Sequence, residues 1–193
     1  KPMIVVMPNG NPNCQAAPGE WSFGMYTPGF RDGGTGPKEP AVATIPESFM
    51  DIVNYVDANY RTLKDRAHRA ICGLSMGGGH TFHVSLLYPN KFDYFGLFSA
   101  GLHLAKGGYQ DSFAEQIKAN PEFADQSARL FASKPKLYWM GMGNTDFLYQ
   151  STVDLRAFWD SKGYKYEYVE TDGGHIWRNW RIYLTMFAQK LFK

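Results

Sequence analysis

Three residues that lie far apart in the sequence have the types and the order required for nucleophilic ester chemistry. Ser75 lies at the centre of GLSMG, which matches the G-x-S-x-G pattern of a nucleophile elbow. A serine hydroxyl is a weak nucleophile at neutral pH, so it needs a general base and an acid that orients the base. Asp146 and then His175 follow Ser75 in the order that accompanies this elbow. The three residues therefore predict a catalytic triad.

The elbow also predicts where a negatively charged oxygen would be stabilised. Glycines on both sides of Ser75 allow a strand and a helix to approach closely, and the turn between them holds the hydroxyl out at the carboxyl edge of a sheet. Met76 then begins the helix. Its backbone N–H is therefore the candidate donor for an oxyanion hole.

Other residues with catalytic or metal-binding side chains are expected to be structural. His80 and His83 stand three residues apart on the helix expected after the elbow, a spacing that could suggest a metal site. No carboxylate or cysteine lies near them in the sequence to complete such a site. We therefore predict no metal and no cofactor. The remaining candidates, also assigned structural roles, are His68, His103, Asp154 and Asp172.

The elements that must position the triad are short apolar runs alternating with helix-permissive stretches. Runs of this length, rich in β-branched and aromatic residues and bounded by turn residues, are typical of buried parallel strands. Residues 103–134 are polar and give little signal. Strands alternating with helices predict an α/β fold with a mainly parallel sheet. Strands are expected at residues 3–7, 69–73, 95–99, 136–140 and 165–169, with helices from residue 46, from the elbow to about 88, around 153–159 and up to 192.

Composition indicates an ordinary globular domain. Of the 193 residues 44% are hydrophobic, and 20 Lys and Arg against 18 Asp and Glu leave a net charge of +2. This balance excludes the strongly basic class of nucleic-acid-binding domains, and no apolar run approaches the roughly 18 residues of a membrane helix. We expect a single domain over residues 1–193. Cys14 and Cys72 predict no disulfide framework, and Cys72 is expected in a buried strand.

Residues 8–44 form a long segment with six prolines and seven glycines, which excludes a helix or a central strand. A loop of this length is uncommon in a compact domain unless it serves a site. The segment carries Trp21, Phe23, Tyr26 and Phe30. We expect it to fold over the site.

Four stretches resemble a known family. AICGLSMGGG at 70–79 resembles the nucleophile segment of esterase-D-like α/β-hydrolases, especially the feruloyl esterases of carbohydrate esterase family one. KPMIVVMPNGN at 1–11 resembles the strand and loop that precede the elbow in that family. DFLY at 146–149 and GGHIWRNW at 173–180 resemble its acid and histidine segments. The resemblance covers almost the whole chain.

The resemblance implies an α/β-hydrolase catalytic domain with Ser75 as nucleophile, Asp146 as acid and His175 as base. It implies hydrolysis of feruloyl esters of plant cell-wall arabinoxylan through an acyl-enzyme, outside the cell or in the periplasm. A feruloyl group is flat and aromatic, which suits stacking on aromatic side chains. The residues expected to contact it are Trp21, Trp177 and Trp180.

Other functions fit the same residues. An acetyl-xylan esterase, or a thioester or siderophore esterase of the same superfamily, would use the same triad. A catalytically impaired carbohydrate-binding relative is a further alternative. The partner expected in each polysaccharide case is the substrate itself, and neither nucleic acid nor a membrane is expected.

The sequence departs from the family pattern at one place. The family's second oxyanion donor comes from a His-Gly loop upstream of the segment that 1–11 resembles, and no such motif precedes Ser75. The family's strand order implies that a further strand separates 3–7 from the strand at 69–73. We therefore expect an N-terminally incomplete sheet, completed by an upstream piece, by strand exchange in an oligomer, or by direct pairing of 3–7 with 70–73.

Overall fold

The computed structural model describes residues 2–8, 45–106 and 110–193. These fall into two compact units, residues 1–63 and 64–193. The helix α1 (Ile45–Asn59) belongs to the first unit. Its apolar residues at 49, 52, 53 and 56 are half-buried, as the expected spacing of an amphipathic helix requires.

The expected strand at residues 3–7 is wrong. Residues 2–8 have no regular secondary structure and are exposed, with Val5 at 70% and Met7 at 88%. A strand forms only where its backbone N–H and C=O groups pair with a neighbouring strand. In the described residues the segment has no such pairing, because the sheet consists of four other strands.

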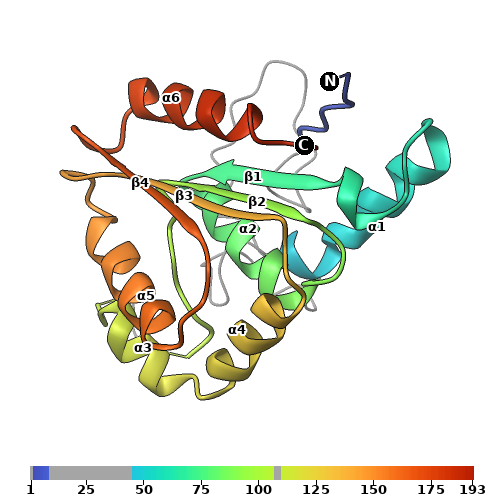
Figure 1. Ribbon diagram of the computed structural model, residues 1–193. Coiled ribbons are helices and arrows are strands. Elements are labelled where there is room, and N and C mark those ends of the chain that lie inside the picture. The colour runs from blue at the N-terminus through green and yellow to red at the C-terminus, as the bar shows by residue number, and fades with distance from the viewer. Residues whose placement is uncertain (1, 9–44, 107–109) are drawn as a thin grey trace, which may run out of the picture. The chain divides into compact units, whose positions relative to one another are not determined.

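The second unit is built on a four-stranded parallel sheet in the order β1-β2-β3-β4 (Figure 1). Because every strand runs in the same direction, all four carboxyl ends lie at one edge, where the loops of an α/β fold carry their functional residues. The strands are β1 (Ala70–Leu74), β2 (Tyr94–Phe98), β3 (Leu137–Gly143) and β4 (Glu167–Thr171). Each lies within a few residues of its predicted position.

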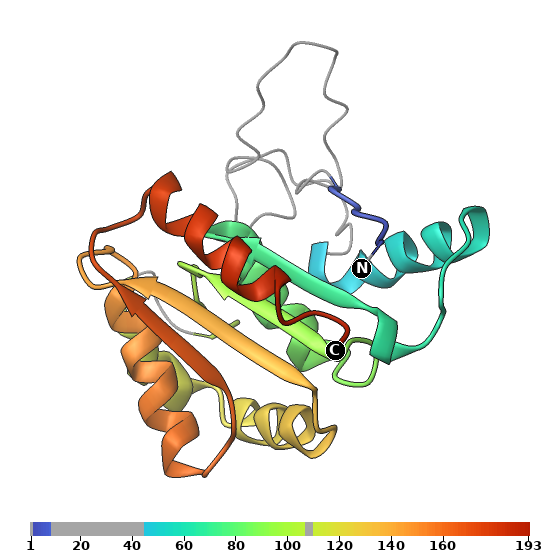
Figure 2. The same cartoon turned by 45° about the horizontal axis from the view of Figure 1, so that its top comes forward.

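Helices cover both faces of this sheet. α6 crosses one face, whereas α2, α4 and α5 lie on the other (Figures 1 and 2). The helices of the unit are α2 (Met76–Leu87), α3 (Phe113–Ala119), α4 (Glu122–Ala132), α5 (Tyr149–Ser161) and α6 (Trp177–Ala188), with a short 3-10 turn η2 (Arg66–His68) ahead of β1.

Alternate residues of the strands fill the core on the two faces. Toward α6, Phe98 and Trp139 pack with Tyr183 and Phe187 of the helix. On the opposite face Tyr138, the neighbour of Trp139, packs against aromatic residues of the strands and helices there, which are Phe95, Phe131 and Trp159. Both faces of β3 are therefore buried, and its carboxyl end is firmly held.

Cys72 is exposed, which corrects the expectation of a core thiol. In the described residues β1 stands at the end of the sheet and pairs only with β2. A residue on an end strand loses the cover that a strand on the other side would supply. Cys14 lies outside the described residues.

Candidate active site

The elbow at Ser75 has the strained backbone that its sequence pattern predicts. Ser75 lies between β1 and α2 with φ 52° and ψ −115°, a backbone conformation that residues other than glycine rarely adopt. Its N–H donates to the carbonyl of Phe98 at 2.9 Å, and its carbonyl accepts from Gly101 N–H at 2.9 Å. The end of β2 therefore holds the strained turn in place from both sides of the serine.

Ser75, His175 and Asp146 lie together in one hydrogen-bonded chain. Ser75 Oγ is 2.8 Å from His175 Nε2, and His175 Nδ1 is 2.9 Å from Asp146 Oδ2 and 3.1 Å from Oδ1. With Nδ1–H donating to the carboxylate, Nε2 is free to accept the serine proton. The predicted proximity of these three side chains is what the structure has.

The carboxylate of Asp146 is buried and oriented by its own loop. Its side chain is fully enclosed, whereas that of His175 is 18% exposed. Leu148 N–H donates to Asp146 Oδ1 at 2.9 Å. Asp146 is also anchored through its backbone, because its N–H donates to the carbonyl of Gly143 at the end of β3. These bonds leave the carboxylate directed at the imidazole.

The loop that carries Asp146 is bonded directly to the turn that carries His175. Asn144 N–H donates to the carbonyl of Thr171 at 2.9 Å, and Thr145 N–H donates to that of Gly173 at 3.2 Å. Both bonds lie just beyond the carboxyl ends of β3 and β4. The parallel pairing of these strands thus continues into the loops and sets the distance between acid and base.

Met76 is the first residue of α2, which has 12 residues. The N–H groups in the first turn of a helix have no carbonyl partner within the helix, and the helix dipole places partial positive charge there. The backbone N–H of Met76, in the residue after Ser75, is therefore suited to donate a hydrogen bond to an anion.

Two aromatic side chains contact the His175 imidazole, and a third packs against one of them. Trp180 contacts it edge-on with ring centroids 4.9 Å apart, but is only 9% exposed and belongs to the core beneath α6. Phe147 lies 4.7 Å from the same ring and is 77% exposed. Trp177 packs on Trp180 at 5.1 Å and is 64% exposed. Of the predicted contact residues, Trp177 has a largely exposed ring, whereas Trp180 packs against His175. Trp21 lies outside the described residues.

Sequence reasoning missed Phe147, although it directly follows the acid. Nothing in the sequence distinguishes it from the apolar residues that commonly follow a strand. Its position becomes meaningful only when the His175 turn is brought against it by the pairing of β3 and β4.

His80 and His83 lie on α2, and the rings of His83 and His103 are 4.8 Å apart. Burial, together with the nearby His103, lowers the pKa of His80 to about 4 and that of His83 to about 3. Both rings are therefore neutral near pH 7. Across the described ranges, no group of His, Cys, Asp and Glu side chains has an arrangement that could hold a metal ion.

The remaining candidates have structural contacts. His68 Nδ1 is 2.8 Å from the carboxylate of Asp65. Asp154 accepts from Ala114 N–H at 3.1 Å and so links α3 to α5. Asp172 Oδ1 accepts from Asn144 Nδ2 at 3.3 Å in the turn before His175.

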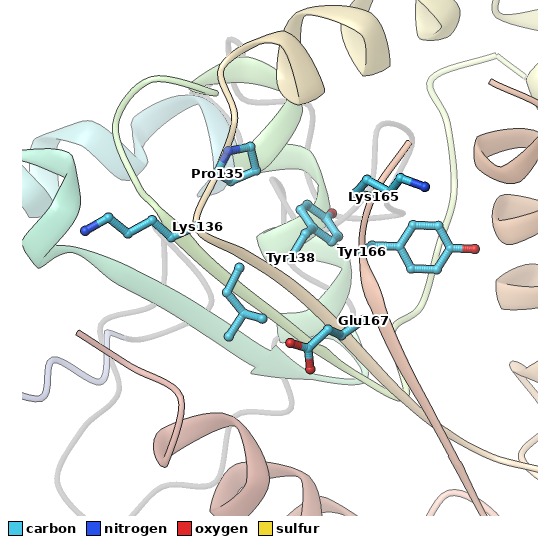
Figure 3. Close-up of a pocket in the computed structure, with 7 residues that line it drawn as sticks. Pro135, Lys136, Tyr138, Lys165, Tyr166 and Glu167 are labelled. Atoms are coloured by element: carbon cyan, nitrogen blue, oxygen red, sulfur yellow. The ribbon is translucent and has the colours of Figure 1, made fainter. Parts of the chain in front are cut away.

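A hollow of about 220 Å³ lies at the opposite end of the sheet (Figure 3). Its lining residues come from the amino ends of β3 and β4, whereas the triad lies beyond their carboxyl ends. The residues that line it are Pro135, Lys136, Leu137, Tyr138, Lys165, Tyr166 and Glu167. None of the predicted catalytic residues lines the hollow.

Among the helices in the described ranges, none has the length and apolar character to cross a bilayer.

Comparison with known proteins agrees with this geometry. The chain matches the Esterase family over residues 1–191. The endo-1,4-beta-xylanase/feruloyl esterase of Xylanibacter ruminicola is 31% identical over 147 residues, covering 74% of this chain and 17% of that protein. The acetyl esterase of Caldicellulosiruptor saccharolyticus is 26% identical over 155 residues, covering 69% of this chain and 58% of that protein.

A solved ferulic acid esterase has the same fold. It superposes with a TM-score of 0.59 at 23% identity, covering 75% of this chain and 60% of that one. The predicted α/β-hydrolase-type parallel sheet is thereby confirmed. This chain spans less than two thirds of the length of each of these three proteins.

Proposed function

The chain belongs to the Esterase family, and we propose that it is a serine esterase in which Ser75 attacks the ester carbonyl. The observation that carries this proposal is the continuous hydrogen-bonded chain from Asp146 through His175 to Ser75 Oγ. Each member has the role that its contacts allow. Ser75 is the nucleophile, His175 the general base, and Asp146 the acid that fixes the imidazole tautomer.

In the first half of the reaction, Ser75 Oγ forms a bond to the carbonyl carbon while its proton passes to His175 Nε2. The imidazolium that results is stabilised by Asp146, which keeps its negative charge. As the tetrahedral intermediate collapses, the bond from carbon to the alcohol oxygen breaks and His175 returns the proton to that oxygen. Water then repeats the sequence on the acyl-enzyme and releases the acid.

The oxyanion formed in both halves lies within reach of the start of α2. We assign the Met76 N–H as one donor, since it begins the helix and lies next to the nucleophile.

For the acyl group we propose a hydroxycinnamate, such as ferulate. Two aromatic rings near His175 are largely exposed, Phe147 and Trp177. A flat acyl group could stack on such rings, with a gain of about 0.5–1.5 kcal/mol beyond area burial. The 31% identity to a xylanase/feruloyl esterase supports the same choice. The substrate would be a feruloylated cell-wall polysaccharide, which implies action outside the cell or in the periplasm.

An acetyl ester of a plant polysaccharide is the second candidate. The similarity to an acetyl esterase favours it. An acetyl group is too small to use the Phe147 and Trp177 rings, so the two substrates make different demands on the same triad. No contact in the described residues favours the thioester, siderophore-ester or non-catalytic carbohydrate-binding alternative.

Steady-state hydrolysis of three esters separates these functions. We expect methyl ferulate to be hydrolysed with a higher kcat/KM than acetylated xylan or a short-chain nitrophenyl ester. Ser75→Ala should abolish turnover of all three. Preference for acetylated xylan would favour the second candidate, and turnover that survives Ser75→Ala would contradict the proposed nucleophile.

A further inference from the structure

Asn179 is a buried polar residue in the first turn of α6 whose side chain faces the turn that carries His175. It has no exposed surface. Its Nδ2 donates to the carbonyl of Asp172 at 3.0 Å and to that of Gly174 at 3.1 Å. One amide group thus bonds to two carbonyls that lie on either side of Gly173.

The turn between these carbonyls depends on a glycine and is closely packed. Gly173 has φ +89°, a conformation that costs free energy for most residues and that only glycine adopts readily. The turn also lies against the end of β3, because a Cβ on Gly143 would stand 2.1 Å from the carbonyl oxygen of Gly173 and 2.9 Å from Asn179 Nδ2. The turn is therefore held between β3 and Asn179.

His175 directly follows the clamped carbonyl of Gly174. Its Nδ1 must meet the buried Asp146 carboxylate while its Nε2 meets Ser75 Oγ. The carbonyl of Asp172 also accepts from Arg178 Nη2 at 3.2 Å, and that of Gly174 from Ile176 N–H at 2.9 Å. Loss of the Asn179 amide would still remove the bridge between the two carbonyls, so the backbone at His175 would be free to shift while Asp146 and Ser75 stay fixed by their own strands. Displacement of a catalytic group by about 1 Å can cost about 10²-fold in rate.

We propose that Asn179 is the positioning residue for the general base: its side-chain amide clamps the turn at 172–174 and so fixes the His175 imidazole between Asp146 and Ser75. Asn179 bonds to the backbone that carries His175 and makes no hydrogen bond to the three triad side chains in the described residues. The inference rests on the proposed esterase function of the triad.

The test replaces the amide by a side chain of similar size that cannot donate. In the 193-residue chain, Asn179→Leu should lower kcat for methyl ferulate by about 10- to 100-fold with KM changed by less than about twofold. It should also weaken or abolish the low-field proton NMR signal of the His175 Nδ1–H, which reports the bond to Asp146. This signal does not depend on turnover.

Asn120→Leu is the matched control. Asn120 is also buried, and its Nδ2 likewise donates to two backbone carbonyls, those of Lys106 and Gln116, away from the triad. It should lower the melting temperature yet leave the His175 signal and the KM-to-kcat pattern unchanged. If Asn179→Leu does not fold, Asn179→Ser keeps one smaller donor and should show a partial loss of kcat and of the signal.

Two results have distinct meanings. A folded Asn179 variant with wild-type kcat and an intact His175 signal would overturn the positioning role, while the proposed function would stand. A wild-type chain that hydrolyses none of the esters would instead contradict the proposed function, and the NMR comparison would still decide whether Asn179 fixes His175.

Discussion

Gly73 and Gly77 approach so closely that a Cβ on Gly73 would stand 2.2 Å from the carbonyl carbon and oxygen of Gly77. This contact is made where β1 ends and α2 begins, on either side of Ser75. The two glycines of the elbow are not equivalent, however. A Cβ on Gly77 would meet no described atom within 4 Å.

The asymmetry predicts different effects of the same substitution. Gly73→Ala should lower the free energy of unfolding by about 1–3 kcal/mol, because the strand and helix must separate, and should reduce kcat by disturbing Ser75. Gly77→Ala should leave stability unchanged or raise it by up to about 1 kcal/mol, since alanine favours a helix. Urea unfolding of both variants measures this. Equal losses would mean that the elbow contact does not determine the packing.

The histidines on α2 predict a loss of stability in acid. His80 and His83 have pKa values of about 4 and 3 in the folded protein, below the ordinary value of 6.5 that applies when unfolded. Between these values the unfolded chain binds more protons, so their contribution is complete above about pH 6.5 and is lost as the pH falls toward 4. At pH 5 each histidine should cost roughly 1–2 kcal/mol.

The substitution His83→Phe tests this, because phenylalanine has a similar shape and cannot be protonated. Thermal unfolding between pH 7 and pH 4.5 should show a flatter pH dependence than the wild type. A wild-type melting temperature that is constant over this range would contradict the burial argument.

The exposed rings near the triad predict substrate selectivity. Phe147→Ala and Trp177→Ala should each raise KM for methyl ferulate about two- to tenfold, as expected for a lost stacking contact, with little change for a short-chain nitrophenyl ester. Neither ring is in the core, so unfolding should be affected little. Steady-state kinetics on both esters measures the difference. Equal losses on the two esters would indicate that the rings only support His175.

The positions of β1, β2 and the elbow could be predicted from sequence because local and tertiary preferences agree there. The strand predicted at 136–140 instead spans Leu137–Gly143. Its glycines read as a turn signal, but Gly141 and Gly143 pair with Val169 and Thr171 of β4, so tertiary pairing extends the strand. The proximity of Ser75, Asp146 and His175 could be predicted because each follows a parallel strand, and the carboxyl ends of these strands lie at one edge of the sheet.

Other features could not be predicted, or were missed. Residues 3–7 have the composition of a buried strand, yet composition alone cannot supply a pairing partner. The capping box of α3, in which Ser112 and Glu115 bond reciprocally, was readable within the stretch of low signal. The role of Asn179 depends on how the start of α6 folds back on the turn at 172–174, and no local sequence pattern indicates that contact.

The free edge of β1 predicts a dependence on a further strand. In the described residues β1 pairs only with β2, which leaves its outer N–H and C=O groups available for pairing. We propose that a strand from a second copy pairs there. The 193-residue chain should then be oligomeric.

Light scattering after size-exclusion chromatography measures the oligomeric state. A monomer would contradict the proposal.

The most direct test of Ser75 as the nucleophile is to detect the covalent acyl intermediate on its side chain. An activated ferulate ester is mixed with the chain, the reaction is stopped in acid, and intact-mass and peptide mass spectrometry locate the acyl group. If Ser75 is the nucleophile and His175 its base, we expect one feruloyl group on the peptide that contains Ser75. It should be absent in Ser75→Ala and much reduced in His175→Gln. An acyl group on another residue, or hydrolysis without any acyl-enzyme in a single turnover, would contradict it.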